Sequence, residues 1–412
     1  HGSLVYLLAF LPGATTASIG AEARGFDAAH ARGLPRPASY TNLRDSQRRL
    51  RIGYVSPDFR AHPVASFLPE VLKHHDRSQV EVFCYSNVRK PDAVTEQLRG
   101  LGTHWREIAS LSDDAAAALI SRDQIDVLID LAMHSAGSRP LLFARKPAPV
   151  QACWLAYPGT TGLDAIDYRV TDSIIDPPGA ADEGYSERSR RLRGCFWCYS
   201  PPPGFPALSE LPALSAGHVT FGSPNSFKKV SDVALELWAS VLEAVPSSRM
   251  LIVAPEGRAW QRVEGAFAAR GVDASRLERL PHVPRPQYLA SLLRMDCVLD
   301  TAPYNGGTAS FDALHSGVPV VSLAGASASA RSGASILHHL GLPKLVATTS
   351  AGFVETARAL VNDLPELAVL RAGLRDRLDA SGLTNPTLFA RDLERSFREM
   401  FQAWASAAPV RG

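Results

Sequence analysis

The sequence predicts an α/β protein with two parallel-sheet domains in tandem, and three observations lead to this fold class. Short apolar runs alternate with helical patterns twice along the chain, which is typical of strands joined by crossover helices. A proline-rich segment at residues 200–212 separates the two series and has the composition of an interdomain linker. The length of 412 residues suits two domains, and 46% apolar with 20% charged residues is the balance of a globular protein with ample core.

The first series of elements follows a segment, residues 1–50, that reads as helical at first and as polar loop from about Arg32. Its strands are continuous apolar runs rather than alternating ones, which suits strands buried on both faces. The expected strands are 51–56, 80–86, 125–131, 150–156 and 168–171. The helices between them are expected at 64–74, 93–101, 113–122 and 140–144.

The second series repeats this alternation after the linker. Its expected strands are 219–222, 249–253, 276–280, 297–300, 319–323 and 344–346. Its expected helices are 232–244, 259–270, 285–294, 308–315, 330–340, 349–363 and 386–405. Two such sheets predict a cleft at the carboxyl ends of the strands, where open α/β sheets bind ligands.

Composition and missing motifs exclude several classes of function. The net charge is +2 without a basic block, so neither a nucleic-acid partner nor a membrane surface is indicated. No Gly-x-Gly-x-x-Gly follows the first strand and no Gly-Lys-Ser/Thr loop is present, which disfavours nicotinamide or flavin enzymes and nucleoside triphosphatases. The five cysteines fit a reducing compartment, hence the cytoplasm. Cys195 and Cys198 have redox or zinc spacing, but a structural role is favoured because zinc wants four ligands.

The stretch from Asp296 to Gly325 is the most informative for function. An apolar strand is followed by a turn containing Gly306 and Gly307, then by a helix that begins near Thr308. Glycines let the backbone approach a ligand, and a helix N-terminus favours an anion such as a diphosphate. Asp312, one turn into the helix, could accept hydrogen bonds from ribose hydroxyls. The stretch predicts half of a nucleotide-sugar site, with an ordinary strand–turn–helix as the alternative.

Several motifs follow one another in a fixed order along roughly residues 51–404. They are RIGYVSPDF (51–59), RKPAPVQ (145–151), WLAYPGTTG (154–162), DYRVTD (167–172), the stretch from FGS (221–223) to Lys229, and the stretch from LDT (299–301) to Leu323. In this order they resemble the catalytic region of the O-linked N-acetylglucosamine transferase family, including its plant fucosyltransferase branch, SPINDLY. The resemblance implies two Rossmann-like domains of the glycosyltransferase B type. It also implies metal-independent, inverting transfer of a sugar from a nucleotide diphosphate to Ser or Thr hydroxyls of proteins.

Two residues are expected to carry the chemistry. His62 follows the first strand, where a histidine could accept a proton from an attacking hydroxyl, and capping of the next helix is the alternative. Lys229 on its own is a lone lysine, but by resemblance it contacts the diphosphate. A fixed cation there stabilises the charge that builds on the leaving group. The neighbouring Lys228 is the competing candidate.

The resemblance implies further binding residues. Thr308 and Asp312 would bind phosphate and ribose, and the donor site would also include Ser226, Gly306 and Gly307. Arg285 and Tyr288 align with family positions near the base and phosphates. On the acceptor or sugar side, His134 matches a SPINDLY-branch histidine, and the residues that follow the next strand could line the same cleft: Tyr157, Pro158, Gly159 and Thr160.

The donor site also departs from the family pattern. The usual threonine run reads Gly307-Thr308-Ala309-Ser310, Ser226 replaces Gln or Asn, and His315 replaces Trp. Loss of one neutral hydrogen bond costs about 0.5–1.5 kcal/mol, which weakens binding without abolishing it. Asp312 favours a uridine donor, whereas 167–172 and 195–199 are closer to SPINDLY.

We therefore expect UDP-GlcNAc as donor, a protein or peptide as acceptor, and no metal or other cofactor. The alternatives are GDP-fucose as donor, a nucleotide-sugar-binding protein with weak activity, and a nucleotide-sugar epimerase. The expected domains are a helical linker region at 1–50, an N-terminal lobe at 51–205, and a nucleotide-sugar-binding lobe with a terminal helix at 206–412. Residues 1–50 are similar to the helices that follow a tetratricopeptide array in this family, and the array itself is expected to be missing from this chain.

Overall fold

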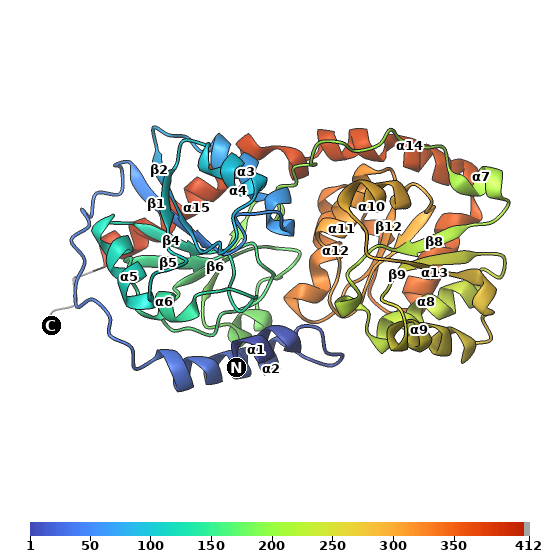
Figure 1. Ribbon diagram of the computed structural model, residues 1–412, viewed down its shortest axis with the longest axis horizontal. Coiled ribbons are helices and arrows are strands. Elements are labelled where there is room, and N and C mark those ends of the chain that lie inside the picture. Colours follow the sequence, from blue (N-terminus) through green and yellow to red (C-terminus); the bar gives the residue numbers. More distant parts are fainter. Residues whose placement is uncertain (408–412) are drawn as a thin grey trace. The chain divides into compact units, whose positions relative to one another are not determined.

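The computed structural model describes residues 1–407, which form two compact units. The first unit contains residues 1–8, 15–200 and the chain from Asn385 onward. The second contains residues 9–14 and 201–384. Figure 1 shows the two units.

The first unit is built on a seven-stranded, all-parallel sheet in the order β3-β2-β1-β4-β5-β6-β7. The strands are β1 (Leu50–Ser56), β2 (Val80–Ser86), β3 (His104–Glu107), β4 (Val127–Asp130), β5 (Val150–Cys153), β6 (Tyr168–Asp172) and β7 (Arg188–Leu192). The five predicted strands are all present. The two strands that the sequence analysis missed, β3 and β7, form the edges and carry charged side chains, which is how native sheets protect their edges.

Helices cover this sheet and join its parallel strands. They are α1 (Gly2–Leu8), α2 (Thr16–Phe26), α3 (Leu68–His74), α4 (Ala93–Arg99), α5 (Asp113–Arg122), α6 (Pro140–Ala144) and α15 (Pro386–Ser406). The helix predicted at 64–74 is divided, because a 3₁₀ turn at Pro63–Ser66 precedes α3. Side-chain caps set the other starts: Ser112 accepts a hydrogen bond from the Ala115 amide, and Asp92 caps α4.

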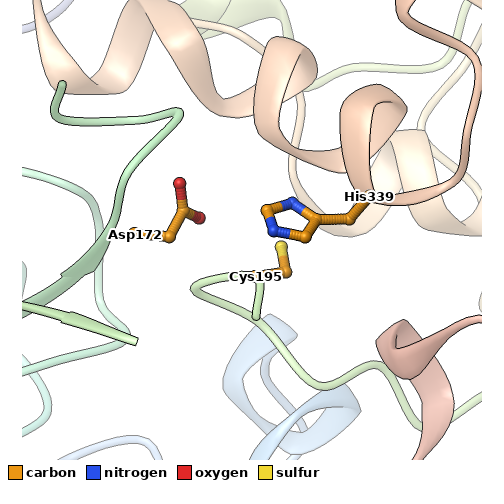
Figure 2. Close-up of side chains that lie close together, drawn as sticks. All are labelled: Asp172, Cys195 and His339. Atoms are coloured by element: carbon orange, nitrogen blue, oxygen red, sulfur yellow. The ribbon is translucent and has the colours of Figure 1, made fainter. Parts of the chain in front are cut away.

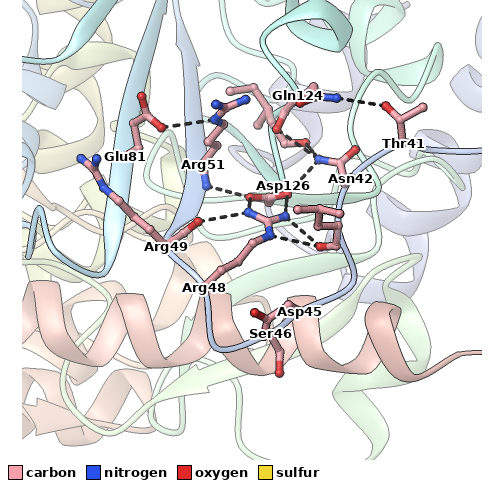
Figure 3. A network of polar contacts seen from close by, with 12 residues as sticks. Thr41, Asn42, Asp45, Ser46, Arg48, Arg49, Arg51, Glu81, Gln124 and Asp126 are labelled. Atoms are coloured by element: carbon pink, nitrogen blue, oxygen red, sulfur yellow. Dashed lines mark hydrogen bonds and ion pairs between the residues drawn. The ribbon is translucent and has the colours of Figure 1, made fainter.

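The polar segment before β1 is fixed to the first unit by one buried carboxylate (Figure 3). Asp126 accepts hydrogen bonds from the Asn42 side chain, from both terminal guanidinium nitrogens of Arg48 and from the Arg51 backbone N–H. Its side chain is fully buried, so these donors offset the cost of removing its charge from water. Residues expected to be a loose polar loop are therefore anchored at the sheet.

The last helix, α15, packs in the first unit. Phe389 stacks on Trp154 at 5.6 Å between ring centroids, and Phe397 lies edge-on to Tyr54 at 6.4 Å. The predicted boundaries assigned this helix to the second lobe. Its apolar face instead covers residues of β1 and the end of β5, although residues 201–384 of the second unit separate them in sequence.

The second unit has a six-stranded parallel sheet in the order β10-β9-β8-β11-β12-β13. Its strands are β8 (Thr220–Ser223), β9 (Arg249–Val253), β10 (Leu277–Leu280), β11 (Cys297–Leu299), β12 (Val320–Leu323) and β13 (Val346–Ala347). Its helices are α7 (Pro212–Ala216), α8 (Asp232–Ala244), α9 (Arg258–Ala268), α10 (Arg285–Leu292), α11 (Thr308–His315), α12 (Ser332–His339), α13 (Ser350–Asn362) and α14 (Leu364–Ala380).

All six strands predicted for this unit are present, and α8 and α9 lie against one face of the sheet with α11 and α12 against the other (Figure 1). In each sheet the first strand lies in the interior. The next two strands are added outward on one side of it and the remaining strands on the other, as in Rossmann-like sheets. The predicted fold class, two Rossmann-like α/β domains, is confirmed. Within residues 1–407, every helix is too short or too polar to span a bilayer.

Candidate functional site

The predicted glycine turn of the second unit is shaped by a buried carboxylate at the end of β11. Asp300 accepts hydrogen bonds from the backbone N–H groups of Thr301 (2.8 Å) and Gly306 (2.7 Å) and from the Ser322 hydroxyl (2.8 Å). A methyl group built on Gly306 would lie 2.2 Å from the Ser310 hydroxyl oxygen, so only glycine fits there. Asp300 thus closes the turn onto the start of α11, a role that the sequence analysis missed.

Lys229 contacts this turn. It ends the 3₁₀ turn Phe227–Lys229 ahead of α8, and its ammonium donates a hydrogen bond to the carbonyl oxygen of Asn305 at 2.8 Å. Burial lowers the pKa of Lys229 to about 8, with the Asp300 carboxylate acting in the opposite direction and Lys228 in the same one. Lys228, the competing candidate, instead has its ammonium 5.8 Å from the Phe10 ring.

Asp312, the predicted ribose ligand, is buried and held by two residues of α10. The Arg285 guanidinium donates to both of its carboxylate oxygens, at 2.8 and 2.7 Å, and the Tyr288 hydroxyl is hydrogen-bonded to it. Burial and the charge of Asp312 raise the pKa of Tyr288 well above its usual value. Arg285 and Tyr288, which were expected near the base and phosphates, therefore orient Asp312 here. A carboxylate has about four acceptor positions, so Asp312 keeps capacity for further donors.

The other predicted donor residues lie at the same edge of the sheet. Thr308 is the first residue of α11, directly after Gly307, and it is partly exposed. Ser226 is exposed at the start of the 3₁₀ turn that carries Lys229. Buried polar atoms lie beside them: within residues 1–407, three of these atoms have no hydrogen-bond partner, namely Ser223 Oγ, Asn225 Nδ2 and Ser310 Oγ.

Asn225 and Ser310 approach each other at the turn. The point 2.2 Å from Ser310 Oγ where a Gly306 side chain would begin is also 3.2 Å from Asn225 Oδ1. Buried polar groups without partners are rare, and they often mark a place where a ligand or water binds. The sequence analysis did not select these two residues. Asn225 precedes Ser226, and Ser310 ends the altered threonine run, so both were within the motifs considered.

His62 lies after β1 in the first unit, with 34% of its side chain exposed. Its Nδ1 is 3.4 Å from the Val64 backbone N–H, the geometry of a helix cap, and 3.6 Å from Asp58 Oδ2. Burial raises the pKa of Asp58 to about 6, and Arg60 opposes the shift. The helix cap considered as an alternative is therefore present.

His134 lies after β4 and is buried. Its Nε2–H donates to the Thr161 carbonyl oxygen at 2.6 Å, and burial lowers its pKa. The His134 and Phe26 rings meet edge-on, with 5.0 Å between their centroids. The last residue of β4, Asp130, caps the backbone N–H groups of Ala132 and Met133 with one oxygen. Burial raises the pKa of Asp130 to about 6, and its other oxygen has no partner within residues 1–407. Asp130 was not selected from the sequence.

The loop after β5 is held in place by hydrogen bonds with Glu187 and Arg169. The Thr160 hydroxyl donates to Glu187 at 2.6 Å, and Arg169 donates from Nε to the Gly159 carbonyl oxygen at 2.8 Å. Tyr157 and Pro158 are buried, and the Tyr157 ring lies 4.9 Å from that of Tyr6 in α1. Burial raises the pKa of Tyr157 well above its usual value. Thr160 thus faces Glu187, and the motif at 167–172 supports this loop through Arg169.

The cysteine pair of the sequence, Cys195 and Cys198, is buried, and neither residue forms a disulfide bond within residues 1–407. Asp172 lies near Cys195 (Figure 2), and its oxygens accept hydrogen bonds from the backbone N–H groups of Ile174, Ile175 and Phe196. His339, also drawn in Figure 2, belongs to the second unit. Within the first unit this group therefore supplies two potential ligand atoms, fewer than the four of a structural zinc site.

The two sheets and the glycine-turn site define the class: the chain belongs to glycosyl transferase family 41, whose model matches residues 34–210 and 207–393. Among curated relatives, it is 37% identical over 378 residues to the probable UDP-N-acetylglucosamine–peptide N-acetylglucosaminyltransferase SPINDLY of Arabidopsis thaliana, covering 90% of this chain and 41% of that protein. The corresponding SEC protein of Arabidopsis thaliana is 30% identical, with 87% and 38% covered. The chain thus spans about two fifths of the length of these relatives.

Solved structures agree with this assignment. The O-GlcNAc transferase of Thermobaculum terrenum, in a lysine-to-methionine variant, is 38% identical with a TM-score of 0.93, and the match covers 98% of this chain and 78% of that one. A glycosyltransferase from Rickettsia africae shares the fold alone, at 11% identity and a TM-score of 0.53, with 85% and 98% covered. The predicted family resemblance is confirmed.

Proposed function

We propose that this protein transfers N-acetylglucosamine from UDP-GlcNAc to Ser or Thr hydroxyls of proteins, with inversion at the sugar carbon and without a metal ion. The observation that carries the proposal is the bond from the Lys229 ammonium to the Asn305 carbonyl oxygen, which places a cation at the glycine turn before α11. The names of the SPINDLY, SEC and Thermobaculum terrenum relatives support this donor and acceptor class.

In this proposal the second unit binds the donor. Lys229 and the first turn of α11 at Thr308 bind the diphosphate, where a fixed cation and oriented amides stabilise the charge that develops as the glycosidic bond breaks. Asp312, oriented by Arg285 and Tyr288, accepts from the ribose hydroxyls. Gly306 and Gly307 let the backbone approach the phosphates, and Ser226 would contact the donor from the 3₁₀ turn that carries Lys229.

The first unit supplies the acceptor side. His62, which follows β1, would accept the proton of the attacking hydroxyl. The loop at 157–160 would support the acceptor or sugar, together with His134. The same arrangement could serve a GDP-fucose donor, and the assays below separate the two. Five buried cysteines that form no disulfide bond within residues 1–407 suit a reducing compartment, so we place this activity in the cytoplasm.

The test combines calorimetry with a transfer assay. UDP should bind more tightly than GDP, and UDP-GlcNAc rather than GDP-fucose should label an acceptor peptide. Lys229→Ala should reduce turnover by about 10²–10³-fold, the loss typical of one preorganised transition-state donor. Lys228→Ala, which alters the adjacent exposed lysine, is the matched control and should retain turnover. Tighter GDP binding with fucose transfer, or nucleotide binding without any transfer, would overturn the proposal.

Metal independence and stereochemistry are tested separately. Turnover should be unchanged by EDTA, because Lys229 supplies the charge that a divalent ion would otherwise provide, and NMR of the glycopeptide should show the β anomer from the α-linked donor. Loss of turnover in EDTA that is restored by Mg²⁺ or Mn²⁺ would refute metal independence without affecting the donor assignment.

A further inference from the structure

Three side chains form a stack beside the glycine turn of the second unit. The ring of Tyr304 has the Lys229 ammonium 4.5 Å from its centroid and stacks on Phe10 at 4.4 Å, with 10° between the ring planes. Phe10 lies in the short segment between α1 and α2 that belongs to the second unit. The Lys229 ammonium therefore packs on the Tyr304 ring, which in turn packs on Phe10. Lys229 is the residue that the proposed function assigns to the diphosphate.

The stack fixes where the lysine side chain ends. Tyr304 is 7% exposed, and its carbonyl oxygen accepts a 2.7 Å hydrogen bond from the Thr301 hydroxyl, which holds the residue within the turn. The next residue, Asn305, accepts a hydrogen bond from the Lys229 ammonium at its backbone carbonyl oxygen. Its side-chain amide donates to the Thr301 carbonyl oxygen. The ring face and the carbonyl oxygen thus fix the ammonium from two directions, both from one constrained turn.

The aromatic face also has an electrostatic effect on the lysine. Its negative face attracts a cation, and the attraction is larger where water is displaced. Burial works against the ammonium and lowers the pKa of Lys229 to about 8. The charged groups that face Lys229 are Asp300, which favours its charged form, and Lys228, which opposes it. Two neutral groups also favour the charged form of Lys229, namely the Asn305 carbonyl oxygen and the ring face of Tyr304.

We propose that Tyr304 is a positioning residue for Lys229: its ring, braced by Phe10, holds the charged ammonium against the Asn305 carbonyl at the glycine turn. The inference deepens the proposed function, because Lys229 acts in that reaction only while it is charged and correctly placed. The phenol hydroxyl has no part in it, so the ring face alone is predicted to matter.

The experiment measures Lys229 directly. The sequence contains six lysines, so NMR of protein labelled with [6-¹³C]lysine gives few signals, and Lys229→Met assigns the relevant one. Tyr304→Leu should lower the pKa of Lys229 by about half to one unit, because the cation–π interaction is lost while apolar volume is kept. Tyr304→Phe retains the ring face and should leave this pKa unchanged. Phe10→Leu should shift it in the same direction as Tyr304→Leu, by less.

Activity provides the second measurement. The alkaline limb of the pH–turnover profile should move to lower pH in Tyr304→Leu by the same amount as the NMR titration, and Tyr304→Phe should keep the parent profile. A parental Lys229 pKa in Tyr304→Leu, or an equal shift in Tyr304→Phe, would overturn the inference. The NMR titration needs no substrate, so it tests Tyr304 even if the sugar assays refute the proposed function.

Discussion

At the scale of single residues, the pairing of Arg285 with Asp312 shows how a buried carboxylate is oriented by its neighbour. Both Asp312 oxygens are engaged by one planar guanidinium, which fixes the carboxylate plane. Lysine in place of arginine provides a single donor point and cannot reproduce this geometry. The orientation of Asp312 therefore depends on Arg285 specifically.

This arrangement gives a prediction for nucleotide affinity. Asp312→Asn should weaken UDP binding by roughly tenfold, because a charge-assisted acceptor is lost. Arg285→Lys should weaken it to a similar or smaller extent through the misplaced carboxylate, and the double variant should be less than additive since the residues act together. Calorimetric titration of the four proteins measures the coupling. Fully additive losses would contradict an orienting role for Arg285.

The sequence supported the prediction of Lys229, Thr308 and Asp312 because they follow strand ends in recognisable motifs. The sequence did not predict that Asp300, Asn305 and Tyr304 are partners in this turn. Their roles come from hydrogen bonds and ring contacts across a folded turn, for example the 2.8 Å bond from Lys229 to the Asn305 carbonyl oxygen, 76 positions away. Backbone acceptors of this kind carry no residue-type signal.

At the scale of elements, apolar runs predicted buried strands well and charged segments poorly. Strands β3 and β7 were missed because edge strands need only one paired side and here carry histidine, arginine and glutamate. Helix α14 was missed although Asp363 caps it, because its buried face includes an arginine. Arg371 is 1% exposed and donates to the carbonyl oxygens of Ser209 and Met295. A search for regularly spaced apolar residues does not detect a helix face that buries an arginine.

Helix α15 offers an element-scale prediction. Glu394 accepts hydrogen bonds from His75 Nδ1 and from the Asp76 backbone N–H, both at 2.8 Å. Glu394→Gln should lower the free energy of unfolding by about 1–3 kcal/mol, because buried donors lose their charged acceptor. Glu399→Gln on the same helix, where the side chain is 50% exposed, should change it by no more than about 0.5 kcal/mol. Denaturant unfolding of both variants checks this, and equal losses would refute it.

The same pair makes stability depend on pH. Burial lowers the pKa of His75 from 6.5, although Glu394 opposes this, so acid protonates the unfolded chain first. For Glu394, burial raises the pKa, but bonds from His75 and Asp76 outweigh it and the net shift is downward from 4.5. Both shifts mean that the unfolded state binds more protons, so stability falls as the pH drops below about 6.5. In Glu394→Gln the part of this loss near pH 4 should be smaller, as measured by unfolding between pH 7 and 4.

At the scale of the whole molecule, the first unit is discontinuous, since α15 completes it after the entire second unit. Phe397 is fully buried on α15, so Phe397→Ala should cost about 3–5 kcal/mol. Amide exchange measured by mass spectrometry should then accelerate in β1, β2 and β4 while β8, β9 and β11 keep their protection. Leu388→Ala, at a 60% exposed position of the same helix, should alter neither. Faster exchange in the second sheet would contradict this division.

The family and the class of both sheets were predictable because the motifs lie in order and the strands are uniformly apolar. The assignment of the last helix was not, since its amphipathic pattern specifies a buried face without naming the sheet that it covers. Phe389 and Phe397 would suit many apolar surfaces, and only their contacts with Trp154 and Tyr54 decide the matter.

The late position of α15 constrains biosynthesis. A ribosome releases the strands of the first sheet long before the helix that covers Tyr54 and Trp154, whereas residues 201–384 emerge as one uninterrupted stretch. During translation the sheet of the second unit can therefore fold while the apolar surface of the first sheet is still uncovered. Chaperone occupancy on nascent chains should accordingly persist until α15 has left the ribosome.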